Sequence, residues 1–187
     1  MSATLDWTIV ERHYRRIDAQ RYWAPTGGSE SFGYSDGDAV EHRIARVLEG
    51  AQDLRTGSEE LMAEISDWPS LYHLSSARAN LLRPLAKRLE GRSVLEIGAG
   101  CGAITRYLGE CAAQVVAVEG SARRASICAA RCRGLDNVAV VCDSFQQFPR
   151  EGRFDVVTLI GVLEYSRRFG DGEDPVNAML ARCVELL

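Results

Sequence analysis

Residues 94–103 read Val94-Leu95-Glu96-Ile97-Gly98-Ala99-Gly100-Cys101-Gly102-Ala103. A mainly apolar run, which predicts a buried strand, leads into three glycines within five residues and then into a helical pattern. Glycine lets the backbone turn sharply and lets a ligand approach the peptide plane where a side chain would collide. One glycine would satisfy a strand-to-helix turn that binds nothing. Three of them indicate that a nucleotide-like ligand lies on this loop.

The pattern of strand followed by helix continues on both sides of this loop, from about residue 75 onward. We expect strands at Ser93–Ile97, Gln114–Glu119, Val138–Cys142 and Phe154–Ile160, and helices at Ser76–Leu89, Ala103–Cys111, Ala122–Cys132 and Pro175–Leu186. The strands are apolar at nearly every position, which is typical of strands buried on both faces. The sequence therefore predicts an α/β fold in which a parallel sheet lies between layers of helices.

Residues 1 to about 70 differ from this pattern and predict a mainly helical N-terminal extension. A helix with one buried stripe is expected over Asp38–Gly50, and a second helix is expected to begin after Ser58, whose hydroxyl can cap it, and to end before Trp68. We therefore divide the chain into an extension, residues 1–70, and a core, residues 71–187. For the Arg-rich stretch near the start, a solvated helix face is favoured over contact with an acidic or sugar-like acceptor. The aromatic residues around this stretch are Trp7, Tyr14, Tyr22 and Trp23.

The composition argues against several classes of protein. The 187 residues leave room for one domain and a modest extension, and the longest uncharged apolar stretch, residues 156–163, is far too short for a membrane span. The net charge is −4 and no basic block exceeds two residues, so we expect no nucleic-acid partner. The six cysteines include no Cys-x-x-Cys pair, so we expect reduced thiols, no metal site and a cytoplasmic protein.

The glycine loop alone leaves two kinds of ligand open. Gly98, Gly100 and Ala103 also satisfy the dinucleotide fingerprint, and Glu119 falls near the spacing of an acid that binds ribose hydroxyls. Glu96, however, places a carboxylate at the end of the strand, where it would repel a pyrophosphate and attract an ammonium or sulfonium group. The sequence thus favours a cationic cofactor, with an NAD-binding domain as the alternative.

Four motifs in order resemble those of the class I S-adenosylmethionine-dependent methyltransferases. The residues that match are Glu96, Gly98, Gly100 and Gly102 in the first motif, Glu119 in VAVEG (116–120), Asp143 in VCDSF (141–145), and FDVV (154–157) leading to GVLEY (161–165). The resemblance covers about residues 70–187 and implies a Rossmann-like fold with S-adenosylmethionine as cofactor.

The resemblance also implies roles for particular residues. In that family the acid that ends the second strand holds both ribose hydroxyls, which here is Glu119, and an acid after the third strand meets the adenine amine, which here is Asp143. A segment just upstream of the core helix closes over the methionine end of the cofactor in that family, so Tyr72, His73 and Arg78 are expected to contact cofactor or acceptor. A surface-exposed linker is the alternative for this segment. The remaining predicted cofactor contacts are Ala99, Gly120, Ser144, Phe145 and Gly161.

Methyl transfer is a one-step displacement, so alignment of the reacting atoms and exclusion of water matter most. A base can assist if the acceptor is a hydroxyl, and the candidates are Glu164, Tyr165 and His73, which should border the cleft. In related sequences a histidine often follows the Leu-Glu pair, whereas Tyr165 stands there in this chain. That departure weakens a catalytic role at this position.

The family's complete sheet has seven strands, and this sequence predicts four. No residue follows Leu187 to supply the others, so we expect a truncated chain or a piece of a longer protein. The fourth strand would then be an unprotected edge, which a homodimer could cover. The expected function is methyl transfer to a small molecule or a glycan precursor. A cofactor-binding or scaffolding fragment without activity is the alternative, and aminopropyl transfer is disfavoured because only Glu164 lies near the fourth strand.

Overall fold

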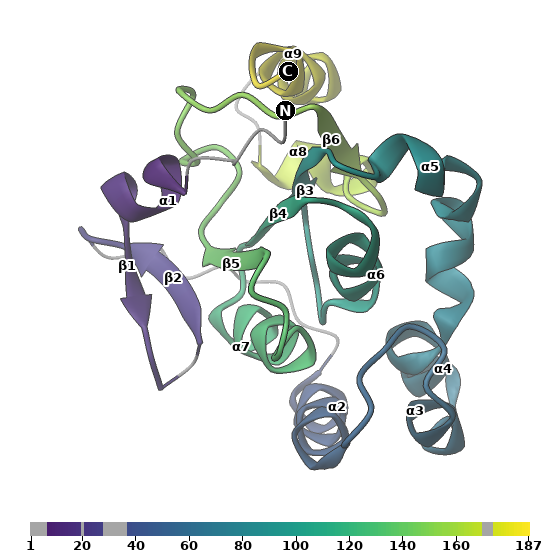
Figure 1. Ribbon diagram of the computed structural model, residues 1–187. Helices are drawn as coiled ribbons and strands as arrows, with labels where there is room; N and C mark the ends of the chain where they lie inside the picture. The colour runs from purple at the N-terminus through teal and green to yellow at the C-terminus, as the bar shows by residue number, and fades with distance from the viewer. Residues whose placement is uncertain (1–6, 20, 28–36, 170–173) are drawn as a thin grey trace.

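The apolar runs around the glycine loop form a sheet. The computed structural model describes residues 7–19, 21–27, 37–169 and 174–187. The predicted strands are β3 (Ser93–Ile97), β4 (Gln114–Glu119), β5 (Val138–Cys142) and β6 (Val156–Leu159). Three have the predicted bounds, and β6 is shorter at both ends. They lie parallel in the order β5-β4-β3-β6, so the predicted parallel sheet is confirmed (Figure 1).

The register brings the carboxyl ends of these strands together. Ile97 at the end of β3 pairs with Val118 of β4 on one side and with Leu159 of β6 on the other. Glu119 at the end of β4 pairs with Cys142 at the end of β5. Because the strands run in one direction, the loops that leave them all lie at the same end of the sheet. That end includes the glycine loop.

Two strands from the N-terminal extension lengthen the sheet beyond β5. They are β1 (Tyr14–Ile17) and β2 (Tyr22–Pro25), which pair antiparallel. Trp23 of β2 pairs in parallel with Val141 of β5. The solvated helix face expected for this stretch is therefore wrong at residues 14–17 and 22–25. The edge of β5 would otherwise be exposed to pairing with another strand, and the hairpin covers it at Val141.

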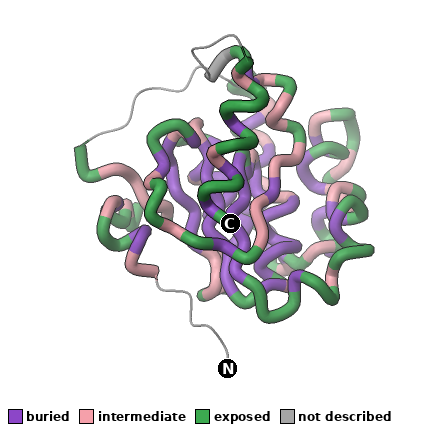
Figure 2. The backbone as a smooth tube through the Cα atoms, turned by 90° about the horizontal axis from the view of Figure 1, so that it is seen from above, coloured by how far each residue is buried: buried purple, intermediate pink, exposed green. Residues whose placement is uncertain are grey.

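Helices cover both faces of the sheet. These helices are α1 (Thr8–His13), α6 (Ala103–Cys111), α7 (Ala122–Arg131) and α9 (Pro175–Glu185). Alternate strand residues point to opposite faces, so Val94 packs with α6 and α7 while Leu95 packs with α1 and α9. Figure 2 shows the buried residues gathered in the central strands and the exposed ones around them.

A third cluster of buried residues joins three helices between residues 37 and 75 to the glycine loop and α7. These helices are α2 (Asp38–Gly50), α3 (Glu59–Ala63) and α4 (Trp68–Leu74). The predicted bounds of α2 are confirmed, and the Ser58 hydroxyl accepts a hydrogen bond from the Leu61 N–H, as expected of a helix cap. Leu48 and Leu74 pack with Cys101 of the glycine loop and Ile127 of α7.

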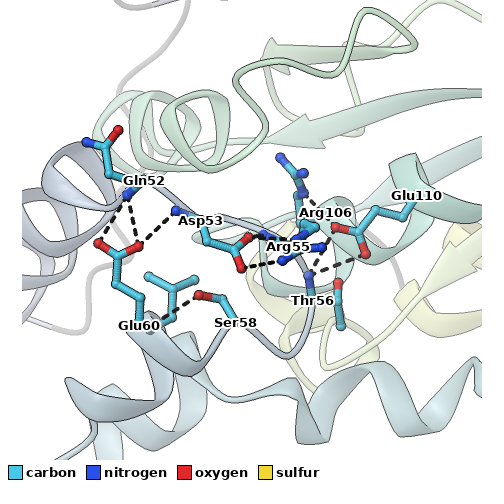
Figure 3. A network of polar contacts seen from close by, with 9 residues as sticks. Gln52, Asp53, Arg55, Thr56, Ser58, Glu60, Arg106 and Glu110 are labelled. Carbon is cyan, nitrogen blue, oxygen red and sulfur yellow. Dashed lines mark hydrogen bonds and ion pairs between the residues drawn. The ribbon is translucent and has the colours of Figure 1, made fainter.

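Polar contacts fasten the connection between α2 and α3 to α6 (Figure 3). The Glu60 carboxylate accepts hydrogen bonds from the N–H groups of Gln52 and Asp53, which closes this connection on itself. The Thr56 N–H donates to Glu110 of α6 at 3.0 Å, and Glu110 also accepts from Arg106 at 2.8 Å. The division of the chain at residue 70 stays a prediction.

The helix expected over Ser76–Leu89 is instead divided into short segments. These segments are the 3-10 helices η1 (Ser76–Leu81) and η2 (Arg83–Leu85) and the helix α5 (Ala86–Leu89). Pro84 supplies no N–H to a helical ladder, which accounts for the break. The remaining short elements are η3 (Leu163–Tyr165) and α8 (Ser166–Phe169). Within the described residues, no helix has the length and apolar character to cross a membrane.

Leu48→Ala tests whether the extension packs on the core. Leu48 is fully buried in the cluster that joins α2 to the glycine loop, so the substitution should lower the free energy of unfolding by about 2–5 kcal/mol. Leu81→Ala, at an exposed leucine, is the matched control and should change it by less than about 0.5 kcal/mol. Urea denaturation of both variants measures the difference, and equal small effects would contradict the packing.

Candidate functional site

The glycine loop between β3 and α6 adopts a backbone that favours glycine. Gly98, Gly100 and Gly102 have φ angles of +75°, +57° and +81°. The N–H groups of Gly98 and Ala99 donate to the Val118 carbonyl at 2.9 and 3.1 Å, which holds the loop against β4. A Cβ on Gly98 would stand 2.5 Å from the Val162 side chain. A Cβ on Gly100 would meet nothing within 4 Å, so the backbone is bare and accessible at that point.

Gly102 serves the packing of the loop. A Cβ there would come within 3.0 Å of the Cys128 Cα on α7, and Gly102 is not among the cavity-lining residues of the described chain. Its left-handed conformation also starts α6. The structure thus separates it from the other predicted cofactor contacts.

A cavity of about 580 Å³ opens beside the loop at the carboxyl ends of the strands. Fifteen of the site residues predicted from the sequence line this cavity: Tyr72, His73, Arg78, Glu96, Gly98, Ala99, Gly100, Glu119, Gly120, Asp143, Ser144, Phe145, Gly161, Glu164 and Tyr165. Sequence reasoning missed Trp68, Pro69, Ile97, Cys101, Ala103, Ile104, Val118, Arg124, Gln146, Ile160, Val162 and Met179. The neighbours of predicted motifs could have been found by their position in the chain, whereas Met179 comes from the distant α9.

Glu96 is a buried carboxylate at the end of β3. Its side chain is 4% exposed, and Oε2 has no hydrogen-bond partner among the described residues. Burial raises the pKa of Glu96 to about 7, while the Thr105 hydroxyl and the charge of Arg78 oppose the shift. The cavity therefore contains a hydrogen-bond acceptor, Oε2 of Glu96, that no described residue satisfies.

Glu119 ends β4 and faces the same cavity. It accepts hydrogen bonds from the N–H groups of Gly100 at 2.7 Å and Ser121 at 2.9 Å, one to each carboxylate oxygen. Burial raises the pKa of Glu119, and these two bonds counteract the rise. The bond to Gly100 ties the carboxylate directly to the glycine loop.

Asp143 follows β5 and completes a set of three buried carboxylates. It accepts from the Ser144 N–H at 2.8 Å and from the Tyr14 hydroxyl at 2.9 Å. Burial raises the pKa of Asp143, and both hydrogen bonds lower it. Tyr14 was not predicted as a site residue. It comes from β1, 129 residues earlier in the chain, and no local signal in the sequence joins the two.

Polar groups also gather at the other end of the cavity. Arg78 lies over the Tyr72 ring, 4.0 Å from its centroid. The Tyr72 hydroxyl, an Arg78 nitrogen and a Glu164 oxygen stand 3.7, 3.8 and 3.8 Å from where a Cβ of Gly161 would lie. A Cβ at this position would make ordinary van der Waals contact with these groups, and it is the φ of +72° that favours glycine there.

The predicted bases differ in exposure. Glu164 is exposed, Tyr165 is partly buried, and His73 is buried against Tyr72, with ring centroids 5.1 Å apart. The His73 carbonyl accepts a hydrogen bond from the buried Arg131, which anchors α4 to α7. Glu164 and Tyr165 are therefore the more accessible of the three.

Arg124 brings a positive charge to the lining. Its Nε donates to the Glu41 carboxylate at 3.0 Å, and both side chains are buried. Glu41 belongs to α2, so this ion pair joins the extension to α7 beside Glu119. Arg124 lies in the first turn of the helix that follows Glu119, which is the signal that could have indicated it.

A known family of proteins matches half of this chain. The family described as "Methyltransferase domain" matches residues 94–187, and the chain belongs to it. A curated relative, the ubiquinone biosynthesis O-methyltransferase of Bordetella avium, is 26% identical over 129 residues, which are 65% of this chain. The chain spans about half of that relative, 49% of its length.

Solved structures match the fold. The N-methyltransferase NodS from Bradyrhizobium japonicum, in complex with S-adenosyl-L-homocysteine, aligns with a TM-score of 0.53 and 18% identity over 80% of this chain and 68% of its own. A DhpI-SAM-HEP complex aligns with a TM-score of 0.50 and 25% identity over 82% of this chain and 63% of its own. The fold is thus the Rossmann-like fold of class I S-adenosylmethionine-dependent methyltransferases.

The chemistry of the lining fits such a cofactor. S-Adenosylmethionine presents ribose hydroxyls and an adenine amine as donors and a positive sulfonium, and carboxylates accept from the first two and attract the third. Glu96, Glu119 and Asp143 supply three carboxylates, and the bare Gly100 leaves room for close approach. A pyrophosphate would meet the same carboxylates as like charges.

Glu96→Gln tests the buried carboxylate. The native protein keeps the Glu96 proton up to about pH 7, whereas the unfolded chain releases it near its ordinary pKa of 4.5. The stability associated with protonated Glu96 is therefore complete below pH 4.5 and is lost as the pH rises to 7. Relative to Glu96→Gln, the wild type should lose up to about 3 kcal/mol of unfolding free energy across this range.

Urea denaturation at several pH values measures this difference. Glu90→Gln, at an exposed glutamate outside the cavity, is the matched control, and its curve should run parallel to that of the wild type. Parallel curves for Glu96→Gln as well would contradict the assignment.

Proposed function

We propose that this chain binds S-adenosylmethionine and forms the cofactor-binding part of an enzyme that transfers a methyl group to a small molecule or a glycan precursor. The observation that carries the proposal is the placement of Glu96, Glu119 and Asp143 in one cavity beside the bare backbone of Gly100. The family of the chain and the fold support it.

In this proposal the two hydrogen-bonded carboxylates hold the adenosyl group. Glu119, oriented by the Gly100 and Ser121 N–H groups, accepts from the ribose hydroxyls. Asp143, oriented by Ser144 and Tyr14, accepts from the adenine amine. The ring of Phe145, which lines the cavity, offers an apolar contact for the base.

The opposite end of the cavity takes the methionine part and the acceptor. The cofactor, when bound, supplies a methyl group activated by a sulfonium. Glu96 provides a carboxylate for the positive charges, and Arg78 provides a guanidinium for a carboxylate of the ligand. The helix α4 covers this end with Tyr72, which excludes water from the reacting atoms.

The acceptor decides whether a base is needed. An amine can attack when neutral, whereas a hydroxyl gains from a base that removes its proton. Glu164 and Tyr165 are the accessible candidates on the cavity wall, and His73 is a buried one. The relatives include an O-methyltransferase and an N-methyltransferase, so both acceptor atoms remain within the proposal.

Titration calorimetry with S-adenosylhomocysteine and with NAD, run in parallel, tests the proposal. We expect saturable binding of the first and none of the second. Retention of NAD, or no binding of an adenosyl compound at millimolar concentration, would overturn it. A methyl-release assay then separates an enzyme from a binding or scaffolding fragment that is inactive alone.

Glu119→Gln should weaken the affinity for S-adenosylhomocysteine by roughly 10- to 100-fold, because it removes a charged acceptor from two ribose hydroxyls. Glu49→Gln, at an exposed glutamate on α2, is the matched control and should bind like the wild type. Calorimetry of the two variants gives the comparison, and equal dissociation constants would contradict the assigned role.

We also propose a homodimer over the edge of the sheet. In the described chain β6 is an end strand and pairs only with β3, so its outer backbone groups are open to pairing with another strand. Light scattering should give about twice the chain mass of 20.6 kDa. A monodisperse monomer across a concentration series would contradict this.

A further inference from the structure

We propose that Tyr14 is a positioning residue of the cofactor site, whose hydroxyl orients the Asp143 carboxylate toward the amine of adenine. The inference rests on the proposed function and deepens it. It assigns part of the base selectivity to the N-terminal hairpin, which lies outside residues 94–187 that match the methyltransferase domain.

Hydrogen bonds to both oxygens restrict the orientation of the Asp143 carboxylate. The Tyr14 hydroxyl donates to Oδ2 of Asp143 at 2.9 Å, and the Ser144 N–H donates to Oδ1 at 2.8 Å. A carboxylate offers about four acceptor directions, so two bonds, one on each oxygen, fix its plane and leave acceptor capacity on both oxygens. Asp143 lines the cavity, where that capacity is available to a ligand.

The hydroxyl is held in place by apolar packing and strand pairing. Tyr14 is only 4% exposed, and its ring stacks on Phe148, with centroids 6.3 Å apart and planes inclined by 24°. Val10 of α1 is buried in the same layer, and β2 pairs with β5 through Trp23 and Val141. The hairpin of β1 and β2 therefore places Tyr14 next to the end of β5, which Asp143 follows.

A buried hydroxyl next to a carboxylate acts here as a donor. Burial and the negative charge of Asp143 raise the pKa of Tyr14, so the phenol keeps its proton. The hydrogen bond in turn opposes the rise that burial causes in the pKa of Asp143. Removing the hydroxyl should therefore shift protonation of Asp143 to higher pH.

Other groups nearby do not replace this contact. The Cys142 thiol precedes Asp143 on β5, and Arg182 of α9 lies over the Phe145 ring, 5.3 Å from its centroid, and donates to the Phe148 carbonyl. Arg182 lowers the pKa of Tyr14, while the pKa of Arg182 is itself lowered by burial. Within the described residues, the side chain that donates to Asp143 is that of Tyr14.

Tyr14→Phe in the full chain tests the inference, because it removes the hydroxyl and keeps the ring. Tyr22→Phe, on the second strand of the same hairpin, is the matched control. Calorimetry at pH 5 to 8 compares S-adenosylhomocysteine with S-inosylhomocysteine, in which a carbonyl replaces the adenine amine. The ratio of the two affinities reports only on folded molecules, so it stays informative if the variant is less stable.

For Tyr14→Phe we expect about fivefold to tenfold weaker binding of S-adenosylhomocysteine and a smaller preference for it over the inosyl compound. As the pH is lowered, the variant should lose affinity at a higher pH than the wild type. Tyr22→Phe should leave all three unchanged. An unchanged preference and pH profile in Tyr14→Phe would overturn the positioning role while the proposed function stands. Absence of S-adenosylhomocysteine binding by the wild type would instead overturn the proposed function.

Discussion

Three carboxylates line one cavity, and hydrogen bonds from the surrounding structure offset part of the free energy that their burial costs. Glu96, Glu119 and Asp143 are 4%, 5% and 7% exposed. A buried charge is unfavourable unless hydrogen bonds or opposite charges compensate it. Backbone N–H groups do this for Glu119 and Asp143. For Glu96, the Thr105 hydroxyl and the charge of Arg78 do not outweigh burial, and its pKa rises to about 7. A positively charged ligand with several donors would satisfy what remains.

The parallel sheet gathers the carboxylates, and α4 and the N-terminal hairpin add groups at the two ends of the cavity. At one end of the cavity α4 brings Tyr72 against Arg78, and at the other β1 brings Tyr14 to Asp143. The buried ion pair of Glu41 and Arg124 joins α2 to α7. The contacts around Glu110 join the connection between α2 and α3 to α6 (Figure 3). The extension is thus a structural part of the cavity as well as a cover for the sheet.

The sequence was informative where structure is local. β3, β4 and β5 were predicted to the residue because each is a mainly apolar run bounded by polar or glycine positions. The same rule failed for β1, whose Arg15 and Arg16 are exposed and resemble a solvated helix face. It also failed to identify α4, because the proline of α4, Pro69, occupies the first helical turn, where a missing N–H does no harm.

By itself the sequence determined the strand order along the chain, the glycine loop and the three acids, because these depend on apolar runs and short spacings. Only the tertiary structure decided that Gly102 packs against Cys128, that Arg124 pairs with Glu41 and that Tyr14 reaches Asp143. Each of these contacts joins residues far apart in the chain. Their meeting is decided by how the helices and the hairpin bury their apolar sides on the sheet, which no local pattern records.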